Sequence, residues 1–306
     1  MTVSPLPALV AVLIAEVALS TAVAWLAAGS RVRKVGAGAA TVALGALPWC
    51  LPASLPLLRG LSALFALVVL MKLVELLRER TPRPFAERLV HVYSLADLRL
   101  ARHGPPRFDL PLLGSGVVCG AVAALLLIAA GSVPAEARPG PLAARWLLGV
   151  ASFYLSFEAI DRLARTAYLL GGAQVEPTQR APILAPTLAD FWGKRWNAIV
   201  RRWLASVFFL PLARKGHARL GILAAFVVSA VIHAYLMLPG LGAGWALCMG
   251  GFFLIHGALC TVERALGVSR WPRALAHVWV LTALLATMPL FIEPLLLLLG
   301  FRPVIG

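Results

Sequence analysis

The chain has 306 residues, of which 60% are hydrophobic and only 13% are charged, and this composition excludes a soluble globular fold. Soluble domains average about 45–50% apolar and about 25% charged residues, so the bilayer is the natural solvent for this chain. The formal net charge of +15 does not indicate nucleic-acid binding, because the basic residues lie in short loops between apolar runs. Basic residues in such loops indicate the orientation of the protein in the membrane and contacts to anionic lipid headgroups or to an anionic cofactor. The four cysteines form no CxxC pair, so neither a disulfide framework nor a metal site is expected.

Apolar runs recur along the chain and predict an all-α integral membrane protein, with residues 1–306 forming a single polytopic domain. Taking about 20 apolar residues per span, we expect about eight transmembrane helices. They run over residues 5–28, 36–57, 60–77, 110–133, 146–170, 218–238, 242–262 and 274–300. The first run has no basic segment before it and contains Glu16, so we expect a spanning helix and not a cleaved signal peptide. Three prolines punctuate the second run, which we expect to be broken or to end near Leu47.

The basic residues predict an orientation. The loops 29–35, 78–109, 162–219 and 263–273 hold 23 of the 28 Lys and Arg residues. The positive-inside rule places such loops in the cytoplasm, which puts both chain termini outside. We therefore expect a multi-pass protein of a bacterial inner membrane with its N-terminus outside.

One segment, residues 186–211, does not have the pattern of a plain span. Placed on a helix, its apolar face carries Trp192, Trp196, Ile199, Val200 and Trp203. Its opposite face carries Lys194, Arg195, Arg201 and Arg202. This pattern is typical of an amphipathic interfacial helix, with Thr187 as its N-cap and with Asp190 and Asn197 at the edge of the basic face. Two interpretations stay open: an ordinary membrane-surface helix, or one whose basic face binds an anionic cofactor while Asn197 points into the protein.

His233 is the single histidine, acid or base in the apolar run 221–238. Ionisable residues inside a span are rare and usually face a cavity or a partner, and Ser229 lies one helical turn earlier on the same face. A neutral imidazole is a competent general base for a hydroxyl, but a histidine bonded to a neighbouring helix fits the pattern equally. His256 is similar, although Gly257 beside it indicates close helix packing and favours a structural role.

Three motifs follow one another in residues 171–306. Residues 190–197 read DFWGKRWN, residues 229–235 read SAVIHAY, and residues 252–266 read FFLIHGALCTVERAL. In order and spacing they resemble the D-F-W-G-R-R-W-[HN], S-x-x-x-H-[EA] and F-F-x-x-H-G-x-x-x-x-x-E segments of the wax synthase branch of membrane-bound O-acyltransferases. Residues 171–306 thus carry a wax-synthase-like catalytic segment, whereas the earlier residues resemble the family only in being hydrophobic. Ala234 departs from the Glu that often follows the histidine, which puts the local tuning of His233 in question.

The resemblance implies an acyl-CoA-dependent O-acyltransferase built around a tunnel, with His233 as the catalytic histidine and Asn197 as the second motif residue. Acyl-CoA is then a co-substrate, with no tightly bound cofactor, and the other partners are a long-chain alcohol or another lipid hydroxyl and the membrane lipids. The candidate substrate-binding residues are Asp190, Trp192, Lys194, Arg195, Trp196, Arg201, Arg202, Ser229 and His256.

Three alternatives stay open on sequence alone. In the first, the chemistry is the same but the acyl acceptor is a sterol, a hydroxylated secondary metabolite, a lipid glycerol or a glycan hydroxyl. In the second, the chain is a transporter, which explains the intramembrane ionisable residues but not the Trp-rich basic segment. In the third, it is an inactive scaffold of the same fold.

Overall fold

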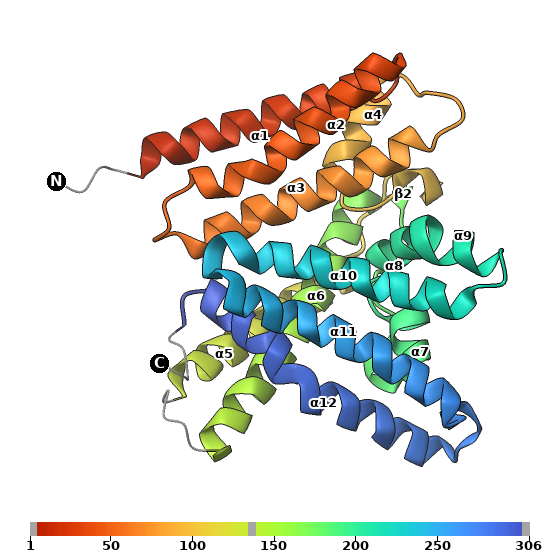
Figure 1. Ribbon diagram of the computed structural model, residues 1–306. Helices are drawn as coiled ribbons and strands as arrows, with labels where there is room; N and C mark the ends of the chain where they lie inside the picture. The colour runs from red at the N-terminus through yellow and green to blue at the C-terminus, as the bar shows by residue number, and fades with distance from the viewer. Residues whose placement is uncertain (1–4, 134–138, 302–306) are drawn as a thin grey trace. The chain divides into compact units, whose positions relative to one another are not determined.

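The computed structural model describes residues 5–133 and 139–301, and most of these residues are helical (Figure 1). The helices are α1 Leu6–Leu26, α2 Arg31–Ala46, α3 Pro56–Leu77, α4 Phe85–Tyr93, α5 Leu110–Ser132, α6 Pro139–Leu170, α7 Leu188–Asp190, α8 Ala198–Leu204, α9 Leu210–Ala213, α10 Ala218–Leu241, α11 Ala243–Ala265 and α12 Arg273–Leu298. A two-residue antiparallel pair joins β1 Arg102–His103 to β2 Ala173–Gln174, with Arg102 opposite Gln174. The predicted all-α class is confirmed.

Six of the described helices are long and apolar enough to cross a membrane, namely α1, α3, α5, α10, α11 and α12. The protein is therefore a multi-pass membrane protein, but the expected count of eight is not confirmed. Helix α2 has only 16 residues and, as expected for a run rich in proline, ends at Ala46 before a short 3₁₀ turn that contains Pro48. Helix α6 has 32 residues, and its later half carries Glu158 and Asp161, which lower its apolar character.

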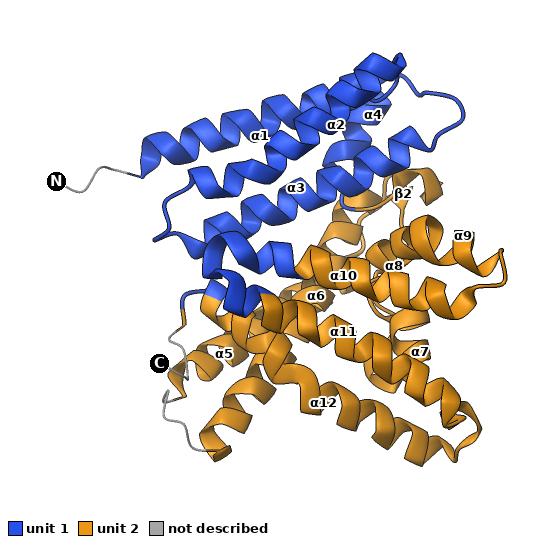
Figure 2. Ribbon diagram, viewed as in Figure 1, with its two compact units in different colours: residues 1–95, 234–246, 298–300 blue, residues 96–233, 247–297, 301–306 orange. Residues whose placement is uncertain are grey.

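The chain divides into two compact units, which are coloured separately in Figure 2. Unit 1 holds α1–α4, the end of α10 and the start of α11, and its core includes the fully buried Val23, Ala37 and Val69. Small residues on α1 and α2 allow these two helices to pack closely. Within α3, Lys72 and Glu75 form an ion pair with 3.9 Å between Nζ and Oε2.

Unit 2 holds α5–α9, most of α10 and α11, and α12 up to Leu297. Its helices α6 and α12 are joined by a buried ion pair between Arg145 and Glu293, 3.0 Å long, and the indole of Trp146 donates to the same carboxylate. A second ion pair in this unit joins Arg162 to Glu158 on α6, with a separation of 3.0 Å. Unit 2 contains the first and third motifs, residues 229–233 of the second motif, and the cavity described below.

The segment 186–211 is not the single amphipathic helix that its sequence predicts. It consists of α7, a π turn over Phe191–Arg195, a break at Asn197, then α8, a second π turn over Ala205–Phe209, and α9. Asn197 has a φ of 38°, in the left-handed region, which ends the first helical piece. The predicted N-cap holds, because the Thr187 hydroxyl accepts from the Asp190 amide at 3.0 Å.

The preceding loop is the physical reason for this break. The carbonyl of Arg195 accepts a hydrogen bond from the Arg180 amide at 3.0 Å, and the Ala198 amide donates to the Thr178 carbonyl at 2.8 Å. Both backbone groups therefore find their partners outside the helix, which is how a chain satisfies its buried polar groups where a helix stops.

Candidate active site

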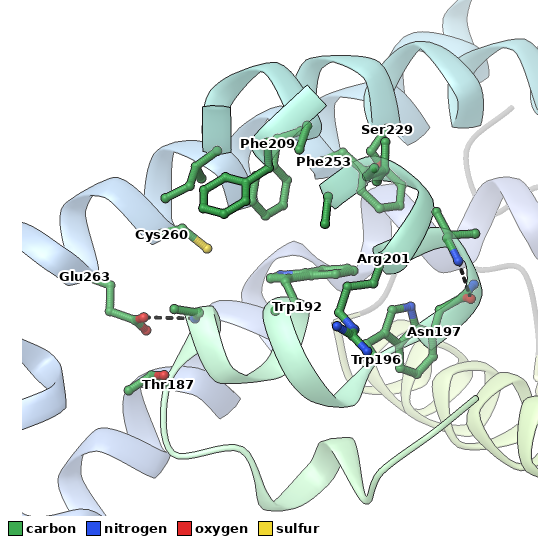
Figure 3. A pocket seen from close by; sticks show the side chains of 18 of the residues that line it. Thr187, Trp192, Trp196, Asn197, Arg201, Phe209, Ser229, Phe253, Cys260 and Glu263 are labelled. Atoms are coloured by element: carbon green, nitrogen blue, oxygen red, sulfur yellow. Dashed lines mark hydrogen bonds between the residues drawn. The ribbon is translucent and has the colours of Figure 1, made fainter. Parts of the chain in front are cut away.

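Unit 2 contains a cavity of about 530 Å³ between the segment 187–210 and helices α10 and α11 (Figure 3). Its middle is apolar and aromatic, with Trp192, Phe209, Phe226 and Phe253 in the wall. Polar side chains lie towards its two ends in Figure 3: Thr187 and Glu263 at one, Asn197 and Arg201 at the other. A concave, mostly apolar pocket with a few polar groups is the usual form of a site for a small molecule.

His233 lines this cavity, and its ring is held in one orientation. The Nδ1 atom lies 2.7 Å from the Ser229 carbonyl oxygen and 3.4 Å from the Ser229 hydroxyl. The imidazole also stacks on the ring of Phe253, with 3.9 Å between centroids. A carbonyl oxygen only accepts, so Nδ1 carries the hydrogen and Nε2 of the neutral ring holds the free lone pair.

Asn197 lines the same cavity and also shapes the backbone beside it. Its Oδ1 accepts from the Val200 amide at 3.2 Å, which caps α8, and its own amide donates to Gln179 Oε1 at 3.3 Å. Because Oδ1 is used as the cap, the side-chain nitrogen is the group left over, and it has no hydrogen-bond partner among the described residues. The site therefore offers a carboxamide donor next to a helix start.

Arg201 is the cavity-lining member of the four predicted basic residues. Its position corrects the helical-wheel prediction, which placed it opposite the tryptophans, because the break at Asn197 changes the register of α8. Its Nε is buried without a partner within the described part of the chain. Burial lowers the pKa of Arg201, and the nearby charges of Arg180 and Arg202 lower it further, whereas the Glu176 carboxylate raises it.

The other basic residues of the motif do not line the cavity, and carboxylates neutralise them. Lys194 and Arg195 both pair with Asp190, the former at 3.3 Å between Nζ and Oδ1. Arg202 pairs with Glu176 at 3.6 Å. Asp190 thus orders the motif rather than facing the cavity.

The structure brings six of the eleven predicted site residues to one cavity wall. These are Trp192, Trp196, Asn197, Arg201, Ser229 and His233. Asp190, Lys194, Arg195, Arg202 and His256 lie outside it. His256 is fully buried and bonded on both ring nitrogens, to Trp192 and to Thr287. The roles of all eleven stay predictions.

Glu263 is a cavity residue to which the sequence analysis assigned no site role. Its carboxylate accepts from the amides of Leu188 and Ala189, at 2.6 and 3.0 Å, and from the indole of Trp279 at 3.1 Å. It therefore holds the start of α7, where free amides favour a negative charge. Its place at the end of the third motif was the available signal, but its amide partners on α7 lie 74 and 75 residues away in sequence.

The fold and the cavity define a polytopic helical membrane protein with an apolar pocket that contains a histidine and a carboxamide. Residues 175–255 match the Membrane bound O-acyl transferase family. This match, together with the relatives described next, confirms the resemblance to the wax synthase branch for the C-terminal segment.

The chain is similar to several curated plant proteins. It is 34% identical over 143 residues to Probable long-chain-alcohol O-fatty-acyltransferase 7 of Arabidopsis thaliana, which covers 42% of each chain. It is 34% identical over 151 residues to Acyl-CoA–sterol O-acyltransferase 1 of the same plant, covering 44% of this chain and 43% of the relative. It is 32% identical over 122 residues to Long-chain-alcohol O-fatty-acyltransferase of Simmondsia chinensis, covering 36% of this chain and 34% of the relative.

The chain thus spans less than half the length of these relatives. Since they come from plants, they lend no support to the expected bacterial inner membrane.

Proposed function

We propose that this protein transfers a long-chain fatty acyl group from acyl-CoA to the hydroxyl of an alcohol. The observation that carries the proposal is that His233 and Asn197, from two separate motifs, line one apolar cavity. Relatives named long-chain-alcohol O-fatty-acyltransferase support the reaction class.

His233 is the general base in this proposal. Nδ1 donates to the Ser229 carbonyl, so Nε2 takes the proton of the alcohol as its oxygen attacks the thioester carbonyl carbon. The tetrahedral intermediate collapses with cleavage of the carbon–sulfur bond. His233 then returns the proton to the leaving thiolate, which yields the ester and free CoA.

Asn197 stabilises the oxyanion. Its Oδ1 is engaged with the Val200 amide, so the NH₂ group is available as a donor. Loss of one such donor typically lowers kcat by about 10²–10³.

Arg201 binds the anionic part of acyl-CoA. It is the motif cation that lines the cavity, and it has no carboxylate partner within residues 5–133 and 139–301, whereas Lys194, Arg195 and Arg202 are paired. Guanidinium groups make strong charge-assisted contacts with phosphate oxygens. The acyl chain lies in the aromatic middle of the cavity, where burial contributes about 0.8 kcal/mol per methylene and favours long chains.

The membrane arrangement is also part of the proposal. We infer that α2 and α6 complete the eight passes, that the cavity belongs to a tunnel, and that the basic loops lie on the cytoplasmic side with the N-terminus outside. The clustering of basic residues in alternate loops supports this orientation.

A direct test measures acyl transfer by the purified protein with palmitoyl-CoA and a long-chain alcohol, in comparison with His233→Ala. Full turnover by the variant counts against the assignment of the base. A sterol acceptor is the second candidate, because one relative is named a sterol O-acyltransferase. Competition between hexadecanol and a sterol for one labelled acyl-CoA separates the two acceptors. Uptake of either molecule into liposomes without ester formation favours the transporter alternative.

A further inference from the structure

We propose that His256 is a positioning residue that fixes the indole of Trp192 as part of the acyl-chain wall. The inference rests on the proposed function, because it assigns the aromatic middle of the cavity to the acyl chain. It begins from a buried polar chain of three side chains, Trp192, His256 and Thr287, which joins the first motif to α11 and α12.

The donors in this chain have only one consistent direction. An indole nitrogen only donates, so Trp192 Nε1 donates to His256 Nδ1 over 3.2 Å. The neutral ring then carries its hydrogen on Nε2 and donates to Thr287 Oγ1 over 2.9 Å. The Thr287 hydroxyl donates in turn to the Ala283 carbonyl over 2.8 Å. The polar side-chain atoms of Trp192, His256 and Thr287 are therefore all hydrogen-bonded, and the tautomer of His256 is determined.

This arrangement separates the two intramembrane histidines. His256 is fully buried, lies outside the cavity and uses both ring nitrogens. His233 lines the cavity and keeps Nε2 without a hydrogen-bond partner among the described residues. Proton uptake by His256 would break the bond to Trp192, so His256 orients the wall and His233 does the chemistry.

The indole that His256 holds is a large part of the cavity wall. Trp192 lies across the middle of the pocket, between Cys260 and Arg201 in the view of Figure 3. Its ring packs edge-on against Phe226 and Phe252, with 6.0 and 6.1 Å between centroids. These apolar neighbours offer no alternative acceptor, so His256 Nδ1 determines how far the indole reaches into the space for the acyl chain.

Two substitutions at one position test this assignment. The side-chain oxygen of Asn occupies nearly the place of histidine Nδ1, so His256→Asn keeps the acceptor for Trp192. Gln places its amide nearer to Nε2, so His256→Gln keeps the partner of Thr287 but removes that acceptor. The measurement is the ratio of kcat/KM for palmitoyl-CoA over lauroyl-CoA. We expect about a tenfold change in His256→Gln, equivalent to about 1.4 kcal/mol, and less than about threefold in His256→Asn.

Two controls separate a positioning role from a general loss of structure. His256→Gln in a Trp192→Phe background, which has no indole N–H, should cause no further change in the ratio, because the two residues act through one bond. His217→Gln in an exposed loop should leave the ratio as it is. An equal change in both His256 variants, or a full effect of His256→Gln without the indole, overturns the proposal.

A readout independent of turnover keeps this inference separate from the proposed function. The ultraviolet resonance Raman difference spectrum between the wild type and Trp192→Phe reports whether the Trp192 indole N–H is hydrogen-bonded. The bonded signature should persist in His256→Asn and vanish in His256→Gln. If the wild type transfers no acyl group, the proposed function is wrong, and the Raman result alone decides whether His256 holds Trp192. The same signature in both variants overturns the proposal.

Discussion

The Nδ1 atom of His233 lies 2.7 Å from the carbonyl oxygen of Ser229, one turn earlier on α10. This bond uses the helix backbone itself to orient the imidazole, so the tautomer does not depend on the side chain of a neighbouring residue. It also accounts for how a histidine followed by Ala234 keeps a defined orientation without the Glu that often follows it in the family.

The first prediction concerns these two residues. His233→Ala should lower kcat by about 10²–10⁴, the usual contribution of a positioned general base, with a small change in KM. Ser229→Ala keeps the backbone carbonyl and loses only the 3.4 Å hydroxyl contact, so its kcat should fall less than about tenfold. Steady-state kinetics on the purified variants measure both values. Comparable losses in the two variants would show that the hydroxyl, and not the carbonyl, orients the ring.

A second prediction separates the two tasks of Asn197. Asn197→Asp retains an oxygen for the Val200 amide and tolerates the φ of 38°, but it lacks the NH₂ donor and adds a negative charge. We expect its thermal stability to stay near that of the wild type while kcat falls at least about 10²-fold. Asn197→Ala loses the cap and is strained at a positive φ, so its stability should fall by about 1–3 kcal/mol as well.

Unfolding and kinetics on the same preparations distinguish these outcomes. If Asn197→Asp retains wild-type kcat, Asn197 is a cap without a role in the chemistry.

A third prediction concerns the anionic substrate. Arg201→Gln should raise KM for acyl-CoA about 10- to 100-fold, which matches the loss of about 1.5–3 kcal/mol for a hydrogen bond to a charged group. Arg202→Gln is the matched control in the next position, and because Arg202 faces Glu176 its effect should stay below about threefold. Initial rates over a range of acyl-CoA concentrations give both values. A larger effect at Arg202 would move the phosphate contact away from the cavity.

These residues also show what the sequence can reveal. The apolar runs and the three motifs are local signals, so they predict the helical membrane class and bring His233, Asn197 and Trp192 forward as site candidates. The partners of the buried acids do not show in the sequence, since the Leu188 amide lies 75 residues from Glu263 and Arg145 lies 148 residues from Glu293.

The helical-wheel pattern of residues 186–211 also could not predict the break at Asn197. A helical wheel assumes that every backbone group is satisfied within the helix, whereas Arg195 and Ala198 bond to the loop at Thr178–Arg180. The resulting change in register is why Arg201 lies in the cavity wall and not opposite it. The count of eight spans stays a proposal for a related reason. Helix α6 carries acids whose partners come together only in the folded chain, such as Asp161, which accepts from the Thr178 amide at 2.8 Å.

A fourth prediction uses two glycines of α11. A Cβ atom at Gly257 would lie 2.8 Å from Phe226 Cβ, so Gly257→Ala should push a cavity-lining phenylalanine aside and destabilise the protein by about 1–3 kcal/mol. A Cβ at Gly251 meets nothing within 4 Å, and Gly251→Ala should be neutral or stabilising by up to about 1 kcal/mol. Thermal unfolding in one detergent compares the two. Equal stability of both variants would mean that α10 and α11 are not held in close contact at Gly257.

The last prediction concerns the ion pair that joins α6 to α12. The residue Arg145 is only 1% exposed. Glu293 accepts from the Arg145 guanidinium and from the Trp146 indole, at 3.0 Å in each case. Glu293→Ala removes this carboxylate from beside a buried cation and should destabilise the protein by about 3–5 kcal/mol. Replacing both charges, as in Arg145→Met with Glu293→Leu, removes the buried cation as well and should recover most of that loss, because apolar pairs of similar volume often substitute without cost.

The Glu158–Arg162 pair on α6 provides a matched control for this effect. It has the same 3.0 Å separation, but the Arg162 side chain is 33% exposed. Water can then solvate the remaining charge, so Glu158→Ala should change stability by only about 0.3–0.5 kcal/mol. Thermal unfolding of all four proteins in one detergent measures these differences. If the two alanine variants lose the same stability, or if the double substitution is no better than Glu293→Ala alone, then burial is not what makes the Arg145–Glu293 contact more important than the exposed pair.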